Sequence, residues 1–326
     1  MISALLLVAG TFVATVPWGR HLIALLRARG AGKQIRVDGP EGHQVKRGTP
    51  TMGGLLILAP VLLIGALLAF RDSRLWAPIA VTLMFAALGA VDDLRGLRDE
   101  QGVGWLARFK FPWQFALGTL GALALFVAGA PREVRVPILG VSIALGAAYV
   151  PLAALVIVAM ANAVNFTDGL DGQAGGTAAP AFVAYGLIAL GPAVDDLGLA
   201  LLCAVFVGGI LAFLWYNVHP AKMFMGDTGA LALGAGLAAV ALLTEYWLLL
   251  PVIGVVFVVE VLSVVLQVAY FKLTHGRRIF RMTPLHHHFE LAGWPETQIT
   301  LRLCLAAAVA ATLGVPLCLT AMPTTA

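Results

Sequence analysis

Acidic residues gather in three short motifs, and their grouping indicates chemistry on phosphates. The motifs are VDDL with Asp92 and Asp93, NAVNFTDGLDG with Asp168 and Asp171, and FMGDTGA with Asp227. Carboxylates held close together repel one another, so such a cluster needs a cation. Oxygen-only ligands suit Mg²⁺, which commonly takes one or two carboxylates and completes its shell with water and substrate phosphates. Each aspartate alone could instead cap a helix, but three motifs together favour a magnesium–phosphate site.

The segment NAVNFTDGLDG is the densest polar stretch of the chain. Its polar side chains recur at every third position, at Asn162, Asn165, Asp168 and Asp171. A helical turn would stack them along one side, whereas Gly169 and Gly172 predict that the helix gives way to a loop here. An ordinary helix-ending turn is the alternative, because Asn, Asp and Gly favour turns.

The segment KRGTPTMGG, residues 46–54, offers groups that suit a phosphate. Lys46 supplies a point charge, Thr51 a hydroxyl, and the glycines accessible backbone N–H groups. The same composition is common in positively charged loops beside membranes, so this motif alone is weak evidence.

The segment TPLHHHFEL contains three consecutive histidines, His286, His287 and His288. On a helix they would point in three directions and could not share one metal, whereas in a loop they could, and imidazole favours zinc or copper over magnesium. We consider three interpretations: imidazole donors to a phosphate or diphosphate, a structural loop, and a transition-metal site. The isolated histidines are interpreted as structural residues; they are His21, His43, His219 and His275.

Glu260, Ser263 and Gln267 share one face of an otherwise apolar segment. They predict either hydrogen bonds between helices or a polar wall of the site, to which Gln267 would contribute.

The composition places these motifs in a membrane protein. The chain has 326 residues, 60% hydrophobic and 12% charged, with a mean hydropathy of +0.92, whereas a soluble domain is about a quarter charged. A membrane span needs about 20 mostly apolar residues. We predict an all-α, polytopic fold in which residues 1–326 form one integral-membrane domain. The ten predicted spans are 3–26, 53–70, 75–91, 112–130, 138–161, 173–191, 197–216, 228–243, 247–271 and 301–320.

The distribution of positive charge predicts the orientation. Of the 21 Lys and Arg residues, all but Arg71, Arg74, Arg132 and Arg135 fall on one set of connections. Positively charged connections stay in the cytoplasm, so both termini should face outward and the aspartate motifs should lie at the cytoplasmic face. The charges are spread over several loops without a basic helix or stacking motif, which argues against a nucleic-acid partner.

Five motifs, in this order, resemble one family over nearly the whole chain: GTPTMGG, VDDL, NAVNFTDGLDG, NVHPAKMFMGDTGALALG and RIFRMTPLHHHFELAGWPE. The sequence is similar to the phospho-N-acetylmuramoyl-pentapeptide-transferases, within the polyprenyl-phosphate N-acetylhexosamine-1-phosphate transferase superfamily. The aspartate motifs are shared across the superfamily, while TPTMGG and the histidine triplet are more specific to the muramoyl branch.

The resemblance implies Mg²⁺-dependent transfer of phospho-MurNAc-pentapeptide from UDP-MurNAc-pentapeptide to undecaprenyl phosphate, giving lipid I and UMP. This would be the first membrane step of peptidoglycan synthesis, catalysed in the bacterial cytoplasmic membrane by a ten-helix protein that is usually a homodimer. By motif position, Asp227 resembles the magnesium ligand, and Asp92 and Asp93 the pair that engages the lipid phosphate or the metal. The positions that resemble the family's nucleoside pocket and its surroundings are Asn165, Asp168, Gly169, Leu170, Asp171 and Phe224. Other functional positions are represented by Lys46, Thr51, Lys110, Asn217, Gln267 and the histidine triplet.

The chain departs from the family in the loop after the aspartate pair. Gly96 and Val103 stand where relatives generally carry lysines, while Lys110 is kept. Arg95 and Arg98 are candidates to replace the lost charges.

Two questions of function stay open at this level. The lipid phosphate could attack the β-phosphate directly, with Asp92 or Asp93 receiving its proton or orienting it, or the reaction could pass through an aspartyl-phosphate. The alternatives to a muramoyl transferase are a related transferase that uses another UDP-N-acetylhexosamine and a transporter, since embedded polar residues also mark solute paths.

Overall fold

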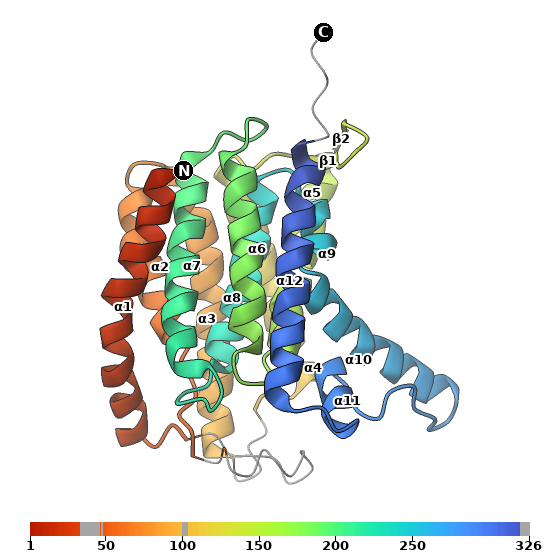
Figure 1. Cartoon of the computed structure of the whole chain (residues 1–326). Helices are drawn as coiled ribbons and strands as arrows, with labels where there is room; N and C mark the ends of the chain where they lie inside the picture. The colour runs from red at the N-terminus through yellow and green to blue at the C-terminus, as the bar shows by residue number, and fades with distance from the viewer. Residues whose placement is uncertain (33–45, 47, 100–103, 320–326) are drawn as a thin grey trace.

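The computed structural model describes residues 1–32, 46, 48–99 and 104–319, which form a bundle of long helices (Figure 1). The main helices are α1 (Ile2–Ala28), α2 (Leu55–Ala69), α3 (Trp76–Arg98), α4 (Ala107–Val127), α5 (Tyr149–Thr167), α6 (Gln173–Leu190), α7 (Leu197–Asn217), α8 (Gly226–Leu243), α10 (Val255–Leu273) and α12 (Glu296–Leu319). The short elements are η2 (Ser73–Leu75), η3 (Gly146–Ala148), η4 (Trp247–Leu249), α9 (Leu250–Ile253), α11 (Leu285–Leu291) and the antiparallel strands β1 (Glu133–Val136) and β2 (Val141–Ala144).

The predicted all-α membrane fold is confirmed. Within the described residues, nine helices are long and apolar enough to span a membrane, and α2 is a shorter apolar helix. The start of α1 and the end of α12 lie at the same end of the bundle, together with the β1–β2 hairpin (Figure 1). The loops that carry the polar motifs are at the other end.

The predicted fifth span, 138–161, is wrong at its beginning. Residues 133–144 form the β1–β2 hairpin, and α5 begins only at Tyr149. Valines at both inner ends of the strands favour extended pairing, and Gly140 takes a positive φ of 64° in the turn. The apolar run therefore covers two kinds of structure.

The predicted ninth span, 247–271, is also divided. Residues 247–253 form η4 and the short α9, and α10 starts after Gly254, where the backbone leaves helical geometry (φ −99°, ψ 30°). Pro251 sits in the first turn of α9, a position that tolerates its missing N–H. The break lets α10 lean away from the rest of the bundle (Figure 1).

Helix α8 is the centre of the bundle and packs against α3 and α5. Almost all of its residues after the first turn are buried. A Cβ at Gly89 of α3 would lie 2.1 Å from the backbone oxygen of Asp227, so the absence of a side chain lets α3 touch the start of α8. This contact is one turn before Asp92 and Asp93, and it brings two aspartate motifs together.

Candidate active site

Two aspartates from different helices share one lysine at the end of the bundle that holds the motif loops. Lys110 of α4 donates to Asp92 Oδ2 of α3 over 2.9 Å and to Asp227 Oδ2 of α8. Asn165 of α5 donates to the other oxygen of Asp227 over 2.8 Å. We call Asp92, Lys110, Asn165 and Asp227 the Asp92–Asp227 cluster. Because each member is on a packed helix, the groups are held at fixed separations.

The two neighbouring aspartates of VDDL have different roles. Both oxygens of Asp93 accept hydrogen bonds from the start of α8: from the backbone N–H of Asp227 at 3.1 Å, and from the N–H and hydroxyl of Thr228 at 2.9 and 2.6 Å. These N–H groups have no partner within the helix, and a carboxylate at a helix N-terminus is also favoured by the helix dipole. Asp93 therefore positions Asp227, while Asp92 faces Lys110.

The motifs TPTMGG and FMGD pair with each other through their backbones. Phe224 N–H donates to Pro50 O over 2.7 Å, Gly53 N–H donates to Phe224 O over 2.7 Å, and Gly54 N–H donates to Met225 O over 3.0 Å. Thr51 is buried, and its own N–H donates to Ala31 O. The N–H groups of Gly53 and Gly54, which the sequence offered to a phosphate, thus bind the segment that leads into α8 and fix the start of that helix.

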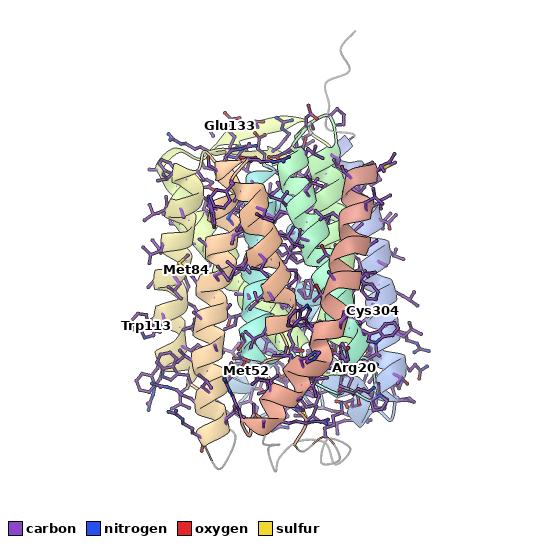
Figure 2. All side chains as sticks on the ribbon, turned by 90° about the vertical axis from the view of Figure 1, so that its left-hand side faces the viewer. Arg20, Met52, Met84, Trp113, Glu133 and Cys304 are labelled. Carbon is purple, nitrogen blue, oxygen red and sulfur yellow. The ribbon has the colours of Figure 1, made fainter. Side chains whose placement is uncertain are left out.

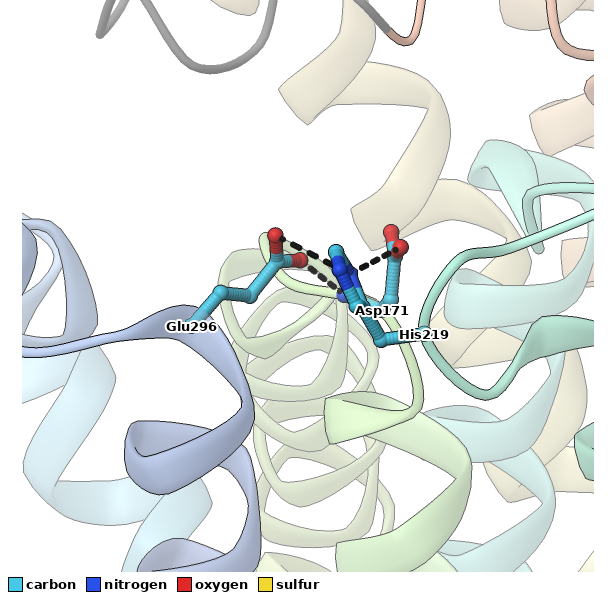
Figure 3. Close-up of side chains that lie close together, drawn as sticks. All are labelled: Asp171, His219 and Glu296. Atoms are coloured by element: carbon cyan, nitrogen blue, oxygen red, sulfur yellow. Dashed lines mark hydrogen bonds and ion pairs between the residues drawn. The ribbon is translucent and has the colours of Figure 1, made fainter.

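A second polar cluster joins four separate segments. Lys46 Nζ contacts Asp171 Oδ1 at 2.7 Å and also Glu296 Oε1, while His219 Nδ1 lies 3.0 Å from Asp171 Oδ2. Figure 3 shows Asp171, His219 and Glu296 turned toward one another. The backbone N–H of Asp171 also donates to Glu296 Oε1, over 2.8 Å. We call Lys46, Asp171, His219 and Glu296 the Asp171 cluster.

The loop DGLDG is held on both sides. Asn217, which is buried, accepts from Gly172 N–H at 3.0 Å and donates to Met223 O at 2.9 Å. Leu170 is buried, and Asp168 caps α5 at the predicted end of that helix. A Cβ at Gly169 would lie 2.0 Å from His286 Nε2, so only glycine lets the histidine ring approach the loop so closely.

The histidine triplet lies on helix α11, and the three rings have different partners. His286 is buried, with Nδ1 3.2 Å from Glu260 Oε1 and 3.4 Å from Gln173 Nε2. His287 pairs with Glu290 at 2.6 Å, and His288 accepts from the N–H of Arg281 at 3.2 Å. A single metal shared by all three does not fit this geometry.

The polar face of α10 binds other segments of the chain. Glu260 pairs with Gln173 and His286, and Ser263 donates to the Glu260 carbonyl oxygen. Backbone groups use most of the hydrogen-bonding capacity of the Gln267 amide. Its Oε1 accepts from the N–H groups of Ile279 and Phe280, and its Nε2 donates to Phe280 O. The bonds of Glu260 and Gln267 to other segments agree with the first interpretation, and a place for Gln267 in the site stays a prediction.

The Asp92–Asp227 cluster has the donor set that suits Mg²⁺. It offers carboxylate oxygens from two helices that already converge on one cationic nitrogen, and the Asp227 side chain is 26% exposed. The Asp171 cluster also brings three potential ligand atoms within 4.8 Å of one another. One of these atoms belongs to an imidazole, and Lys46 already lies between the two carboxylates. The Asp92–Asp227 cluster is therefore the better site for Mg²⁺, which prefers oxygen ligands.

Sequence reasoning missed two members of the Asp171 cluster. His219 was interpreted as structural but lies 3.0 Å from Asp171, and Glu296 begins α12 directly after Pro295. The sequence signals for these two residues were a histidine followed by a proline in NVHPAK and an acidic residue at the start of a helix. Neither signal identifies a partner elsewhere in the chain. His43 and Val103 lie outside the described residues, as does Arg47 of the KRGTPTMGG motif.

The fold and the clustered carboxylates define a membrane protein with a polar site at one end of its helices, and comparison with known proteins shows that its class is a transferase. Residues 75–245 match the model of glycosyl transferase family 4, and residues 46–58 match signature 1 of the phospho-N-acetylmuramoyl-pentapeptide-transferases.

Curated relatives cover nearly the whole chain. A phospho-N-acetylmuramoyl-pentapeptide-transferase of Chloroflexus aurantiacus is 47% identical over 98% of this chain and 90% of its own length. Proteins of the same name from Moorella thermoacetica and Geobacillus kaustophilus are 44% and 43% identical, over 92% and 94% of this chain and 94% and 95% of their own lengths. The chain belongs to the phospho-N-acetylmuramoyl-pentapeptide-transferase family.

Proposed function

We propose that this protein transfers phospho-MurNAc-pentapeptide from UDP-MurNAc-pentapeptide to undecaprenyl phosphate, with lipid I and UMP as products. The family membership and the name of the relatives support this assignment. The observation that carries it in the structure is the convergence of Asp92, Asp227 and Lys110 from three packed helices. Such a centre combines negative oxygens for a cation with a positive charge for phosphate, as transfer between two phosphorylated substrates requires.

Asp227 and Asp92 would hold Mg²⁺, with Asn165 fixing the orientation of the Asp227 carboxylate. The bound ion would supply charge neutralisation at the diphosphate of the donor. Lys110 would then be released from one or both carboxylates, and its ammonium could pair with phosphate oxygens instead. After this exchange each carboxylate still has a cation as its partner, and Lys110 still has an anion.

In the proposed reaction an oxygen of the lipid phosphate attacks the β-phosphorus of the donor. A new phosphorus–oxygen bond forms, the bond to the bridging oxygen breaks, and UMP leaves with that electron pair. Asp92 orients the lipid phosphate or receives its proton. Asp93 is less suited to this role, because the first turn of α8 uses both of its oxygens. If an aspartyl-phosphate forms instead, trapping a phosphosugar on purified enzyme without lipid acceptor would reveal it and overturn direct attack.

We further propose that the site faces the cytoplasm. The excess of Lys and Arg on the connections at this end supports that orientation, and a soluble nucleotide donor requires it. In sealed vesicles, labelling of a cysteine introduced near His275 should then occur only from the cytoplasmic side.

The function is tested by measuring UMP release in detergent. UDP-MurNAc-pentapeptide and UDP-GlcNAc are compared as donors, each with undecaprenyl phosphate and with Mg²⁺ or EDTA. We expect release only with the muramoyl donor and only with the metal. Equal or greater release from UDP-GlcNAc would support the related transferase, and no release from either donor would contradict transferase function.

A further inference from the structure

Glu260 is a buried acid inside a membrane-spanning helix. It follows five apolar residues at the start of α10, and it is 1% exposed. Side-chain nitrogen and oxygen atoms gather toward the two ends of the bundle, and carbon prevails between them (Figure 2). An acid within a span is costly, and such residues commonly mark function. Glu260 belongs to neither polar cluster described above, so its role is a separate one.

Three N–H groups converge on the Glu260 carboxylate. Its Oε1 lies 3.2 Å from His286 Nδ1 and accepts from Gln173 Nε2 over 3.1 Å, and its Oε2 accepts from the backbone N–H of His286 over 3.3 Å. A carboxylate can only accept hydrogen bonds, so Nδ1 of His286 carries a proton, because a bare nitrogen there would face a negative oxygen. Glu260 therefore fixes both the backbone and the protonated ring nitrogen of His286.

The opposite edge of the His286 ring contacts a loop. Its Nε2 is buried and has no hydrogen-bond partner among the residues that the structure describes. A Cβ on Gly169 would lie 2.0 Å from this atom, so a hydrogen of the Gly169 Cα points at it. A bare nitrogen accepts such a close C–H contact, whereas a proton on Nε2 would be pressed against the glycine. The ring is thus a spacer of fixed width between Glu260 and Gly169.

Glu260 holds the DGLDG loop, residues 168–172, by two routes. The first is the His286 ring against Gly169, and the second is Gln173, which begins α6 directly after the loop. The same loop joins the two polar clusters: Asn165, in the last turn of the preceding helix, belongs to the first, and Asp171 belongs to the second. A shift of the ring would therefore move backbone that lies between the two clusters.

We infer that Glu260 is a positioning residue for the nucleotide donor and that it acts through His286 on the DGLDG loop. The loop carries Asp168 and Asp171 at the end of the bundle that holds the motif loops, so it suits a soluble polar substrate rather than a prenyl chain. Loss of the Glu260 charge frees the ring to take a proton at Nε2, and the loop must then move away. This inference rests on the proposed function, because it concerns the binding of one of its two substrates.

The test is a steady-state UMP-release assay on Glu260→Gln, which removes the charge and keeps the size of the side chain and one acceptor oxygen. Each substrate is varied with the other saturating. Hydrogen bonds to charged groups contribute about 1.5–3 kcal/mol, so KM for UDP-MurNAc-pentapeptide should rise about tenfold. KM for undecaprenyl phosphate and kcat should change by less than about threefold. A purely structural role would instead lower the active fraction, and with it kcat, without a change in either KM.

His286→Asn tests the same inference from the other side of the ring. The asparagine amide nitrogen takes nearly the place of Nδ1, so Glu260 keeps its donor, but the edge that contacts Gly169 is lost. KM for the nucleotide should again rise about tenfold. Because Glu260 acts through His286, the variant with both substitutions should match His286→Asn within about twofold. If Glu260→Gln alone does not fold in detergent, His286→Asn supplies the measurement.

Thr177→Val is the matched control. Thr177 is a buried residue one turn further along α6, and its hydroxyl donates to the carbonyl oxygen of Gln173 over 2.8 Å. The substitution removes a buried polar group next to the network and leaves the three groups that contact the Glu260 carboxylate in place. KM for both substrates should equal that of the wild type.

Three results would overturn the inference and leave the proposed function intact. The first is an unchanged KM for the nucleotide in Glu260→Gln or His286→Asn, whatever happens to kcat. The second is an equal rise in KM for both substrates, and the third is an additive effect in the variant with both substitutions. A wild-type enzyme without UMP release would contradict the proposed function itself.

Discussion

The Asp92–Asp227 cluster and the Asp171 cluster use the same chemical groups in different structural settings. Each places one lysine between two carboxylates, Lys110 in the first and Lys46 in the second. The first cluster draws its members from helices that pack along their length. The second joins loop ends and the start of α12 (Figure 3). Rigid helices suit groups that must keep a reacting geometry, whereas ion pairs between loops mainly hold those loops together.

The largest effect should come from Asp227. We expect Asp227→Ala to lower kcat by about a hundredfold or more, because removal of a preorganised electrostatic group costs about that much in enzymes. The protein should still elute as a folded species in detergent, since Asp93 would still cap α8 through backbone N–H groups. UMP release and gel filtration measure the two properties. Near-wild-type turnover would show that the metal assignment is wrong.

Lys110 is the next position to test the first cluster. Lys110→Met keeps most of the length of the unbranched side chain but leaves Asp92 and Asp227 without their shared cation. We expect kcat to fall about ten- to a hundredfold, since the positive charge next to the transferred phosphate is lost. If the metal and the lysine compete for the same oxygens, the variant should reach half-maximal activity at a lower Mg²⁺ concentration than the wild type. A Mg²⁺ titration in which the variant needs as much metal as the wild type, or more, would argue against that competition.

The division between Asp92 and Asp93 can be tested through stability. Asp93→Asn removes the charge at the start of α8 and part of its hydrogen bonding, and loss of such a cap costs about 0.5–2 kcal/mol. We expect a lower melting temperature than that of Asp92→Asn, which leaves the cap intact. If Asp92→Asn is the less stable variant, the assignment of Asp93 to positioning is wrong.

The smallest effect should come from His219 of the Asp171 cluster. Its side chain is 41% exposed, and exposed ion pairs contribute only about 0–1 kcal/mol. His219→Gln keeps a hydrogen-bond donor for Asp171, so we expect kcat to change by less than about threefold. A much larger loss of kcat would contradict this prediction and indicate that His219 takes part in the reaction.

The sequence predicted the helices and the motifs that form the two polar clusters, because both depend on local composition. Long apolar runs and positive charges depend on local composition, so the spans were predictable except where Gly254 and the valine-rich hairpin interrupt them. Partners across the chain were not predictable. Nothing local indicates that Asp93 binds the start of α8, that Glu296 reaches Asp171, or that Gly169 makes room for His286.

The most direct test of the central claim is a parallel measurement of kcat for Asp92→Asn and Glu296→Gln with both substrates saturating. Each substitution neutralises one carboxylate that accepts a lysine ammonium, and each leaves the size of the side chain almost unchanged. We predict that Asp92→Asn loses about a hundredfold or more, while Glu296→Gln stays within about tenfold of the wild type. Equal losses in the two variants, or a larger loss for Glu296→Gln, would contradict the assignment of the chemistry to the Asp92–Asp227 cluster.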